Sequence, residues 1–231
     1  MNLHPAHHPL LVGCIDSEEL LRRCARQAPA VCDVLEVRLD LTGLCGGAWL
    51  ELCAAIEQQN KPVLLTIRSR REGGEWRGRE AQRLALYLRA LRVVSMLDVE
   101  LAATGTVSML VQAAKSEDIV LIGSFHNFRK TPPLPRLLAV AQRGRQLKVD
   151  VVKIATRVNT SAELAILMAL PALVKGPLSV MGMGPLGGLS RVAMAGAGSH
   201  MVYGSLAKAT APGQPPCHEL AKELTRWGLR N

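Results

Sequence analysis

The segment VDVVKIATRVNTSAELAILMALPALVKGPLSVMGMG, residues 149–184, decides the fold of this chain. It holds two short runs of β-branched and apolar residues, VDVVKIA and PLSVMGMG, on either side of the Ala- and Leu-rich stretch SAELAILMALPALV. The polar run Asn159-Thr160-Ser161 predicts a helix N-cap at the start of that stretch. The segment therefore predicts a strand, a helix and a second strand parallel to the first.

The same alternation continues through the rest of the chain. Apolar runs of this kind begin at Leu10, Asp33, Pro62, Val93, Asp118, Val149, Pro177 and His200. Amphipathic or Ala/Leu-rich stretches begin at Ser17, Ala48, Gly78, Pro135 and Ser161, and Ser17 is placed to cap the first of them. Strict alternation predicts parallel strands joined by right-handed crossovers. Eight such units in 231 residues predict a single (β/α)8 barrel domain, residues 1–231, of α/β class with helices outside.

An open doubly wound sheet is the alternative fold. It would favour a Gly-rich turn after the first strand, but the turn from Cys14 to Ser17 lacks the G-x-G-x-x-G pattern. A dinucleotide cofactor is therefore not expected, and the sequence predicts no other cofactor.

Composition limits the partners. The chain has 28 Lys and Arg against 19 Asp and Glu, which suits an anionic partner. Aromatic residues are only 3%, too few for the stacking platforms of single-strand binders, and the basic residues are scattered. We therefore interpret the charge as mainly solvated surface that could steer a small anionic substrate, and we expect no nucleic acid. No apolar run approaches the ~20 residues of a membrane helix, and the first residues lack a secretory pattern. The six cysteines show no C-x-x-C spacing, so the sequence predicts no metal site. We expect most of them to be small buried residues of a protein in the reducing cytoplasm.

Polar residues gather near the C-terminal end of each predicted strand. Residues two apart share one face of a strand, and the residues that do so are Glu36, Arg38 and Asp40; Thr66 and Arg68; Asp98 and Glu100; and Ser124 and His126. Lys153 stands alone in its strand, and the connections add Glu72, Arg191 and Gln214. In a parallel barrel these strand ends meet at one mouth, where active sites lie. Each residue alone could be a structural ion pair or a rim charge, but together they indicate one site.

Lys153 gives the sharpest chemical signal. Its apolar neighbours predict burial, and desolvation lowers the pKa of an ammonium group. A partly neutral lysine is a nucleophile for carbonyl carbon, and His126 on the adjacent strand could move protons beside the resulting iminium. The structural alternative is a permanently charged lysine paired with Glu36 or Glu100.

The connection from Met181 to Arg191 is rich in glycine. It could cradle a phosphate, since barrels often bind phosphate after strands seven and eight, although it lacks a P-loop ending. The alternative is a mobile lid that brings Arg191 to a carboxylate.

The motifs taken together resemble type I 3-dehydroquinate dehydratase. The matching segments are EVRLD at 36–40, TIRSRREGG at 66–74, DVEL at 98–101, SFHNF at 124–128 with TP at 131–132, VDVVKIA at 149–155, MGPLGGLSR at 183–191 and APGQ at 211–214. They occur in the order of the family and cover nearly the whole chain.

The resemblance implies a lysine imine on a barrel, without metal or cofactor, in a homodimeric enzyme that forms 3-dehydroshikimate. Lys153 would condense with the ketone, His126 would remove the α-proton and protonate the departing hydroxyl, and Glu72 would orient His126. Arg191 would bind the carboxylate. The other substrate contacts implied are Glu36, Arg38, Arg68, Thr210 and Gln214. This chain departs from the family at Asn127, usually Asp, which should face away from His126, and at Thr210, usually Ser.

Two other functions are compatible with parts of the pattern. A class I Schiff-base aldolase would also use Lys153 but would cleave a carbon–carbon bond. A basic nucleic-acid-binding module would explain the charge and leave Lys153 and His126 without a role.

Overall fold

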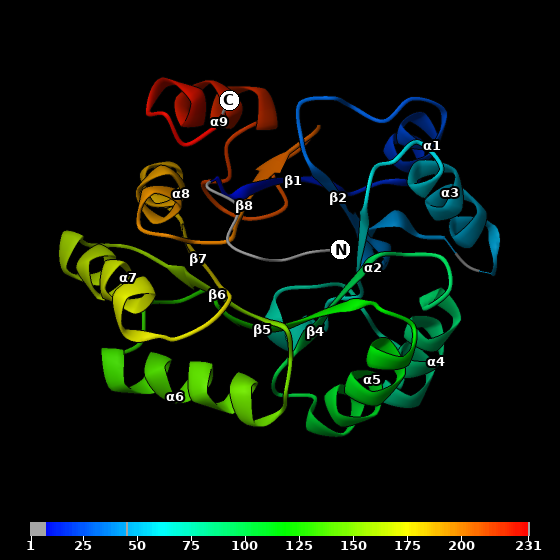
Figure 1. Ribbon diagram of the computed structural model, residues 1–231, viewed down its shortest axis with the longest axis horizontal. Helices are drawn as coiled ribbons and strands as arrows, with labels where there is room; N and C mark the ends of the chain where they lie inside the picture. Colours follow the sequence, from blue (N-terminus) through cyan, green and yellow to red (C-terminus); the bar gives the residue numbers. More distant parts are fainter. Residues whose placement is uncertain (1–7, 45, 231) are drawn as a thin grey trace.

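The computed structural model describes residues 8–44 and 46–230, and within them eight parallel strands form a nearly closed barrel (Figure 1). The strands are β1 (Leu10–Ile15), β2 (Val34–Arg38), β3 (Val63–Thr66), β4 (Met96–Glu100), β5 (Val120–Asn127), β6 (Val151–Arg157), β7 (Leu178–Met183) and β8 (Met201–Ser205). They pair in the order β7-β6-β5-β4-β3-β2-β1-β8. The predicted (β/α)8 barrel is confirmed, and a strand overlaps each of the predicted runs.

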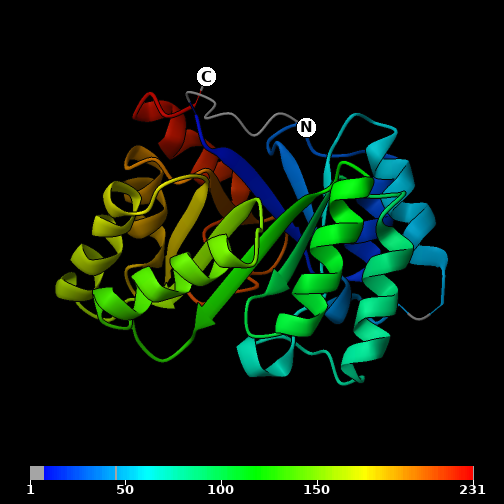
Figure 2. The ribbon, with the colours of Figure 1, turned by 60° about the horizontal axis from the view of Figure 1, so that its bottom comes forward.

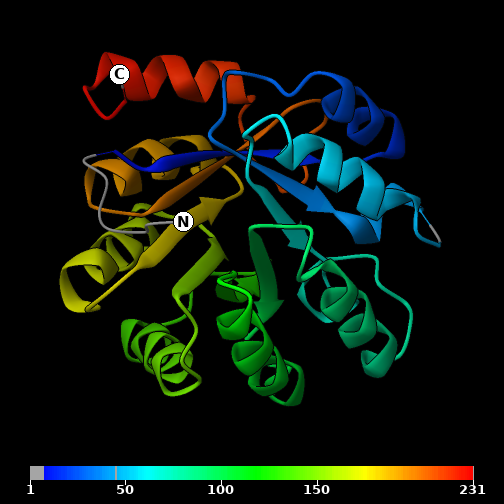
Figure 3. The same ribbon diagram turned by 45° about the vertical axis from the view of Figure 1, so that its right-hand side comes forward.

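Helices surround the strands, as Figures 2 and 3 show. They are α1 (Glu18–Arg26), α2 (Leu39–Thr42), α3 (Ala48–Glu57), α4 (Glu80–Ala90), α5 (Thr104–Ser116), α6 (Leu134–Gln146), α7 (Ser161–Leu173), α8 (Gly187–Gly196) and α9 (Cys217–Arg226). Both predicted N-caps are present: Ser17 Oγ accepts from the Leu20 amide at 3.3 Å, and Thr160 Oγ1 from that of Glu163 at 3.2 Å. None of the helices in the described part of the chain is long and apolar enough to cross a membrane.

Two separate layers of side chains form the core. On β2, Leu35 and Val37 pack outward into the large cluster that also contains buried helix residues such as Leu21. Val34, on the other face of β2, packs inside the barrel with Leu64 and other strand residues. Alternation along each strand therefore directs every second residue into the barrel, which is how the polar residues reach its interior.

The barrel is nearly closed between β7 and β8, the two ends of the strand order. The amide of His200 donates to the carbonyl of Leu178 at 2.9 Å near the base. Nearer the mouth, the Arg191 side chain bonds the carbonyl oxygens of Gly182 on β7 and Tyr203 on β8, both at 2.9 Å. A side chain from α8 thus completes the closure at the mouth.

Three local predictions were wrong. Asp40 lies in α2 and not on the second strand, because β2 ends at Arg38 and the chain turns. Arg68 lies beyond β3, which ends at Thr66. Residues 187–191 form the first part of α8 and not a loop, so Arg191 is carried by a helix.

Candidate active site

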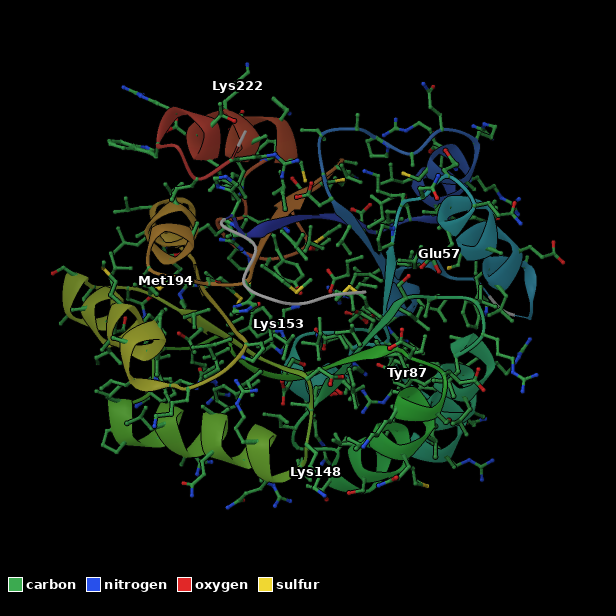
Figure 4. The ribbon with its side chains drawn as sticks, in the orientation of Figure 1. Glu57, Tyr87, Lys148, Lys153, Met194 and Lys222 are labelled. Carbon is green, nitrogen blue, oxygen red and sulfur yellow. The ribbon has the colours of Figure 1, made fainter. Side chains whose placement is uncertain are left out.

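The side chain of Lys153 lies inside the barrel, in the centre of the ring of strands in Figure 4, whereas Lys148 and Lys222 lie at the periphery. It is 4% exposed. Its Nζ atom is 2.9 Å from Oδ2 of Asp98 and 3.5 Å from Oε1 of Glu36. The nitrogen is therefore desolvated, as the sequence predicted, but two carboxylates compensate its charge.

Asp98 is the acid at the centre of the site. It is fully buried, and its Oδ1 accepts from Arg68 Nη2 at 2.7 Å and from Ser124 Oγ at 2.6 Å. Burial raises the pKa of Asp98, but Arg68 and Lys153 outweigh burial and hold that pKa well below its ordinary value. Asp98 therefore remains an anion between two cations.

His126 and Glu72 form a second pair. His126 lies on β5 near the mouth of the barrel, and its Nδ1 atom is 2.9 Å from Glu72 Oε2. Burial, then Arg68 and Lys153, hold the pKa of His126 well below its ordinary value, so the imidazole is neutral near pH 7. Burial also raises the pKa of Glu72 to about 7. A neutral imidazole beside a carboxyl group can accept a proton through its other nitrogen.

The position of Glu72 depends on a tight turn. It ends the short 3₁₀ helix η1 (Arg70–Glu72), and Gly73 follows with φ 79°. A Cβ atom at Gly73 would lie 2.3 Å from the Phe128 ring. Only glycine accepts both this conformation and this contact, so the sequence EGG places the carboxylate beside β5.

The three arginines of the pocket differ in their partners. Arg38 forms two hydrogen bonds to Asp40, at 3.0 and 2.8 Å, and Arg68 contacts Asp98 and Glu100. In contrast, Arg191 is 1% exposed and, within the described residues, no carboxylate lies within 4.0 Å of its nitrogens.

The hydrogen bonds that Arg191 makes within residues 8–44 and 46–230 all go to backbone carbonyl oxygens. Its Nε and Nη1 atoms donate to those of Gly182, Gly187, Tyr203 and Gly213. Burial lowers its pKa to about 10, so the guanidinium is charged at neutral pH without a neighbouring acid. A buried cation of this kind is suited to bind an anion from outside the protein.

The segment between β8 and α9 closes the other side of the pocket. Gln214 Oε1 accepts from the amide and hydroxyl of Thr210, at 2.7 and 2.9 Å, while its Nε2 donates to Cys14 Sγ at 3.2 Å. The Cys14 thiol donates in turn to Glu36 Oε2 at 3.0 Å. This chain of bonds fixes the orientation of the Gln214 amide and the Glu36 carboxylate.

All nine residues that the sequence indicated as site residues line one pocket. They are Lys153, His126, Glu72, Glu36, Arg38, Arg68, Arg191, Thr210 and Gln214. Asn127 lies outside this lining, and its Oδ1 accepts from the amides of Arg129 and Lys130. The roles of the nine residues remain predictions.

Several lining residues were not assigned to the site from the sequence. The pocket also contains Cys14, Phe128, Ala155, Met181, Met183 and Tyr203. Cys14 and Tyr203 lie on inward faces of β1 and β8, so the alternation that found Glu36 could have found them. Asp98 was noted in the sequence pattern, but its contact with Lys153 required the register of β4, β5 and β6.

The chain is similar to known proteins. A model of the type I 3-dehydroquinase family matches residues 11–228 of the chain. The chain belongs to this family. It is 32% identical, over 85% of its length and 86% of the relative, to a 3-dehydroquinate dehydratase of Methanothermobacter thermautotrophicus, and 34% identical, over 92% and 84%, to that of Albidiferax ferrireducens.

Solved structures agree with this assignment. The type I 3-dehydroquinate dehydratase of Clostridium difficile, with covalent modified comenic acid, superposes with a TM-score of 0.88 at 25% identity, covering 96% of this chain and 94% of that one. The enzyme of Aquifex aeolicus gives 0.85 at 28% identity, covering 94% and 98%. The activity of the chain is therefore the dehydration of 3-dehydroquinate, a lyase reaction of the shikimate pathway.

Proposed function

We propose that the enzyme dehydrates 3-dehydroquinate through a Schiff base on Lys153. The supporting observation is that a buried amine, a neutral imidazole and an arginine without an acidic partner face one pocket. The ammonium form of Lys153 first gives one proton to the neutral His126, and the free amine attacks the ketone carbon. That proton and a second one from the nitrogen pass to the former carbonyl oxygen, which leaves as water, so the remaining N–H stays on a protonated imine. That cation can accept the electron pair of the neighbouring carbon–hydrogen bond.

His126 moves the protons in this scheme. Its neutral imidazole removes the α-proton, and the electron pair of that bond forms an enamine. The enamine then expels the β-hydroxyl group, which takes the proton from His126 and leaves as water. Hydrolysis of the imine releases 3-dehydroshikimate and returns the amine. Glu72 acts by accepting a hydrogen bond from the Nδ1–H group of His126, which keeps the ring proton on Nδ1 and leaves Nε2 as the base that faces the substrate.

The substrate carboxylate binds Arg191 in this proposal. The other two arginines of the pocket already have acid partners, so Arg191 is the cation with a free capacity for an anion. The hydroxyl groups of the substrate contact the remaining polar side chains, which are Glu36, Arg38, Arg68, Thr210 and Gln214. This set suits a polyhydroxy carboxylate better than the phosphorylated substrate expected of many aldolases.

Borohydride trapping tests the proposal. Borohydride added during turnover of 3-dehydroquinate should reduce the imine to a secondary amine, which peptide mass spectrometry should locate at Lys153. Replacement of Lys153 by Ala should abolish turnover and the adduct, whereas the same change at the exposed Lys222 should leave both unchanged. His126→Ala should retain the adduct and block elimination. No adduct, or an adduct at another lysine, would refute the assignment of the nucleophile.

We further propose a single domain, residues 1–231, that forms a homodimer in the cytoplasm, uses no cofactor and binds no nucleic acid. Cys14, Cys24, Cys32, Cys53 and Cys217 are buried free thiols, which suits a reducing compartment. Cys45 lies outside the described residues. Sedimentation equilibrium tests whether the enzyme is a dimer, and cell fractionation tests its location. Titration with duplex and single-stranded nucleic acid in low salt tests whether the enzyme binds nucleic acid.

A further inference from the structure

Tyr203 presents the face of its ring to the proposed nucleophile. The Lys153 Nζ atom lies 3.9 Å from the ring centroid. The ring lines the pocket and is 3% exposed. The hydroxyl group contacts the Met201 Sδ atom at 3.8 Å, two residues earlier on β8 and so deeper in the barrel. The aromatic face, and not the hydroxyl group, is therefore what Tyr203 offers to Lys153.

The backbone beneath this ring is fixed from two sides. The Tyr203 carbonyl accepts the Arg191 Nε–H at 2.9 Å. The following residue, Gly204, lies so close to α9 that a Cβ atom there would be 2.8 Å from Cys217 Sγ. The ring is thus held in place by β8, α8 and the start of α9.

The nitrogen loses hydrogen-bond donors during the proposed reaction. A lysine ammonium has three N–H groups, which can serve both Asp98 and Glu36. A protonated imine on the same nitrogen has one N–H group and cannot serve both carboxylates. The face-on contact with Tyr203 needs no N–H group, so it persists when a hydrogen bond is lost.

An aromatic face also differs chemically from a carboxylate at this position. Its quadrupole attracts a cation, most strongly in a desolvated site. It cannot take the proton of the imine, whereas a carboxylate can. The phenol remains neutral, because burial and the charges of Glu36 and Asp98 raise the pKa of Tyr203 well above its ordinary value.

We propose that Tyr203 stabilises the cationic imine on Lys153 through a cation–π contact and so favours the form of the intermediate that accepts electrons. This inference rests on the proposed Schiff-base function. The ring contributes more to the imine than to the resting ammonium, because the ammonium retains its two carboxylate partners. Tyr203 therefore supports the chemical step, whereas Arg191 supports substrate binding.

Fluorinated phenylalanines at position 203 test this inference. Tyr203→Phe removes the hydroxyl that contacts Met201 and keeps the aromatic face, so it is the reference variant of the series. Replacing that Phe with monofluoro-, difluoro- and trifluorophenylalanine weakens the quadrupole with little change in size. The fraction trapped by borohydride and kcat should fall stepwise, on the order of tenfold across the series. Thermal unfolding should stay constant, which separates the effect from loss of structure.

The same series at Phe125 is the matched control. Phe125 lies on β5 and packs against the outer, helix-facing cluster, away from Lys153. Its fluorination should leave trapping unchanged. If the wild-type enzyme forms an adduct at Lys153 and the position-203 series is flat, this inference is overturned and the proposed function stands. If the wild-type enzyme forms no adduct at Lys153, the proposed function itself fails.

Discussion

A single oxygen of Glu72 serves His126 twice: Oε2 accepts the backbone N–H of His126 and lies 2.9 Å from its Nδ1 atom. Both distances are 2.9 Å, so the carboxylate fixes the ring and the strand end together. The protonation state of Glu72 therefore decides which ring nitrogen of His126 carries a proton.

This pair should produce a pH-dependent rate. Because burial raises the Glu72 pKa to about 7, the carboxyl group is protonated below that pH and ionised above it. A protonated Glu72 donates to Nδ1 and leaves the proton of His126 on Nε2, so the base is blocked. We expect kcat to rise as pH increases through about 7. In Glu72→Gln the rise should vanish and the plateau should fall by about tenfold to a hundredfold. An unchanged rise in the variant would exclude this coupling.

Arg191 should affect both binding and stability. Arg191→Lys keeps a charge but loses the planar fork that bonds carbonyl oxygens on β7 and β8. We expect kcat/KM to fall by about a hundredfold or more, mainly through KM, and unfolding free energy to fall by about 1–3 kcal/mol from unpaired buried carbonyls. Steady-state kinetics and urea unfolding measure the two effects. A variant with normal KM would show that another group binds the carboxylate.

Asp98 should control stability at acid pH. The pKa values of Asp98, Glu36 and Glu100 all lie below their ordinary values in the folded state. These carboxylates therefore stabilise the fold fully above about pH 4, the range of unfolded carboxyl groups, and the stabilisation is lost as pH falls below it.

The substitution Asp98→Asn tests this relationship. It leaves Arg68 and Lys153 without their shared anion and should cost about 3–5 kcal/mol at pH 7. The variant should also lose less stability than the wild-type enzyme between pH 5 and the acid transition. Urea unfolding at a series of pH values measures both quantities. Equal slopes for the two proteins would contradict the assigned role of Asp98.

The barrel could be predicted from the sequence because apolar runs typical of strands alternate with amphipathic stretches typical of helices along the chain. The sequence also predicted which residues meet at the mouth, since parallel strand ends converge there. It could not predict which arginine of the pocket has an acidic partner. Arg68 contacts Asp98 because of the register of the strands, and Arg191 contacts carbonyl oxygens on β7 and β8 because α8 carries it. The Gly-rich residues before Arg191 were predicted to form a loop because glycine is a poor helix former. In the structure, residues 187–196 form α8, which packs against β7, and this packing overrides the preference of glycine.

Cys14 on β1 makes two side-chain hydrogen bonds within the pocket. Its thiol donates to Glu36 and accepts from Gln214, so it joins a strand to the segment before α9. Burial, then Glu36, raise the pKa of Cys14 far above its ordinary value, which keeps the thiol protonated and unreactive. Iodoacetamide should therefore leave Cys14 unmodified in the native enzyme and modify it after unfolding, as peptide mass spectrometry would show.

Substitution separates the hydrogen bonds of Cys14 from its bulk. Cys14→Ser keeps a donor and an acceptor and should retain kcat/KM within a few-fold. Cys14→Ala leaves Glu36 Oε2 and Gln214 Nε2 without this partner, and we expect KM to rise about tenfold because one such bond contributes about 1 kcal/mol or more near a charge. If Ala and Ser behave alike, the thiol acts only by filling space, and the orientation of Glu36 is set by Thr66, whose hydroxyl donates to Oε1 at 2.9 Å.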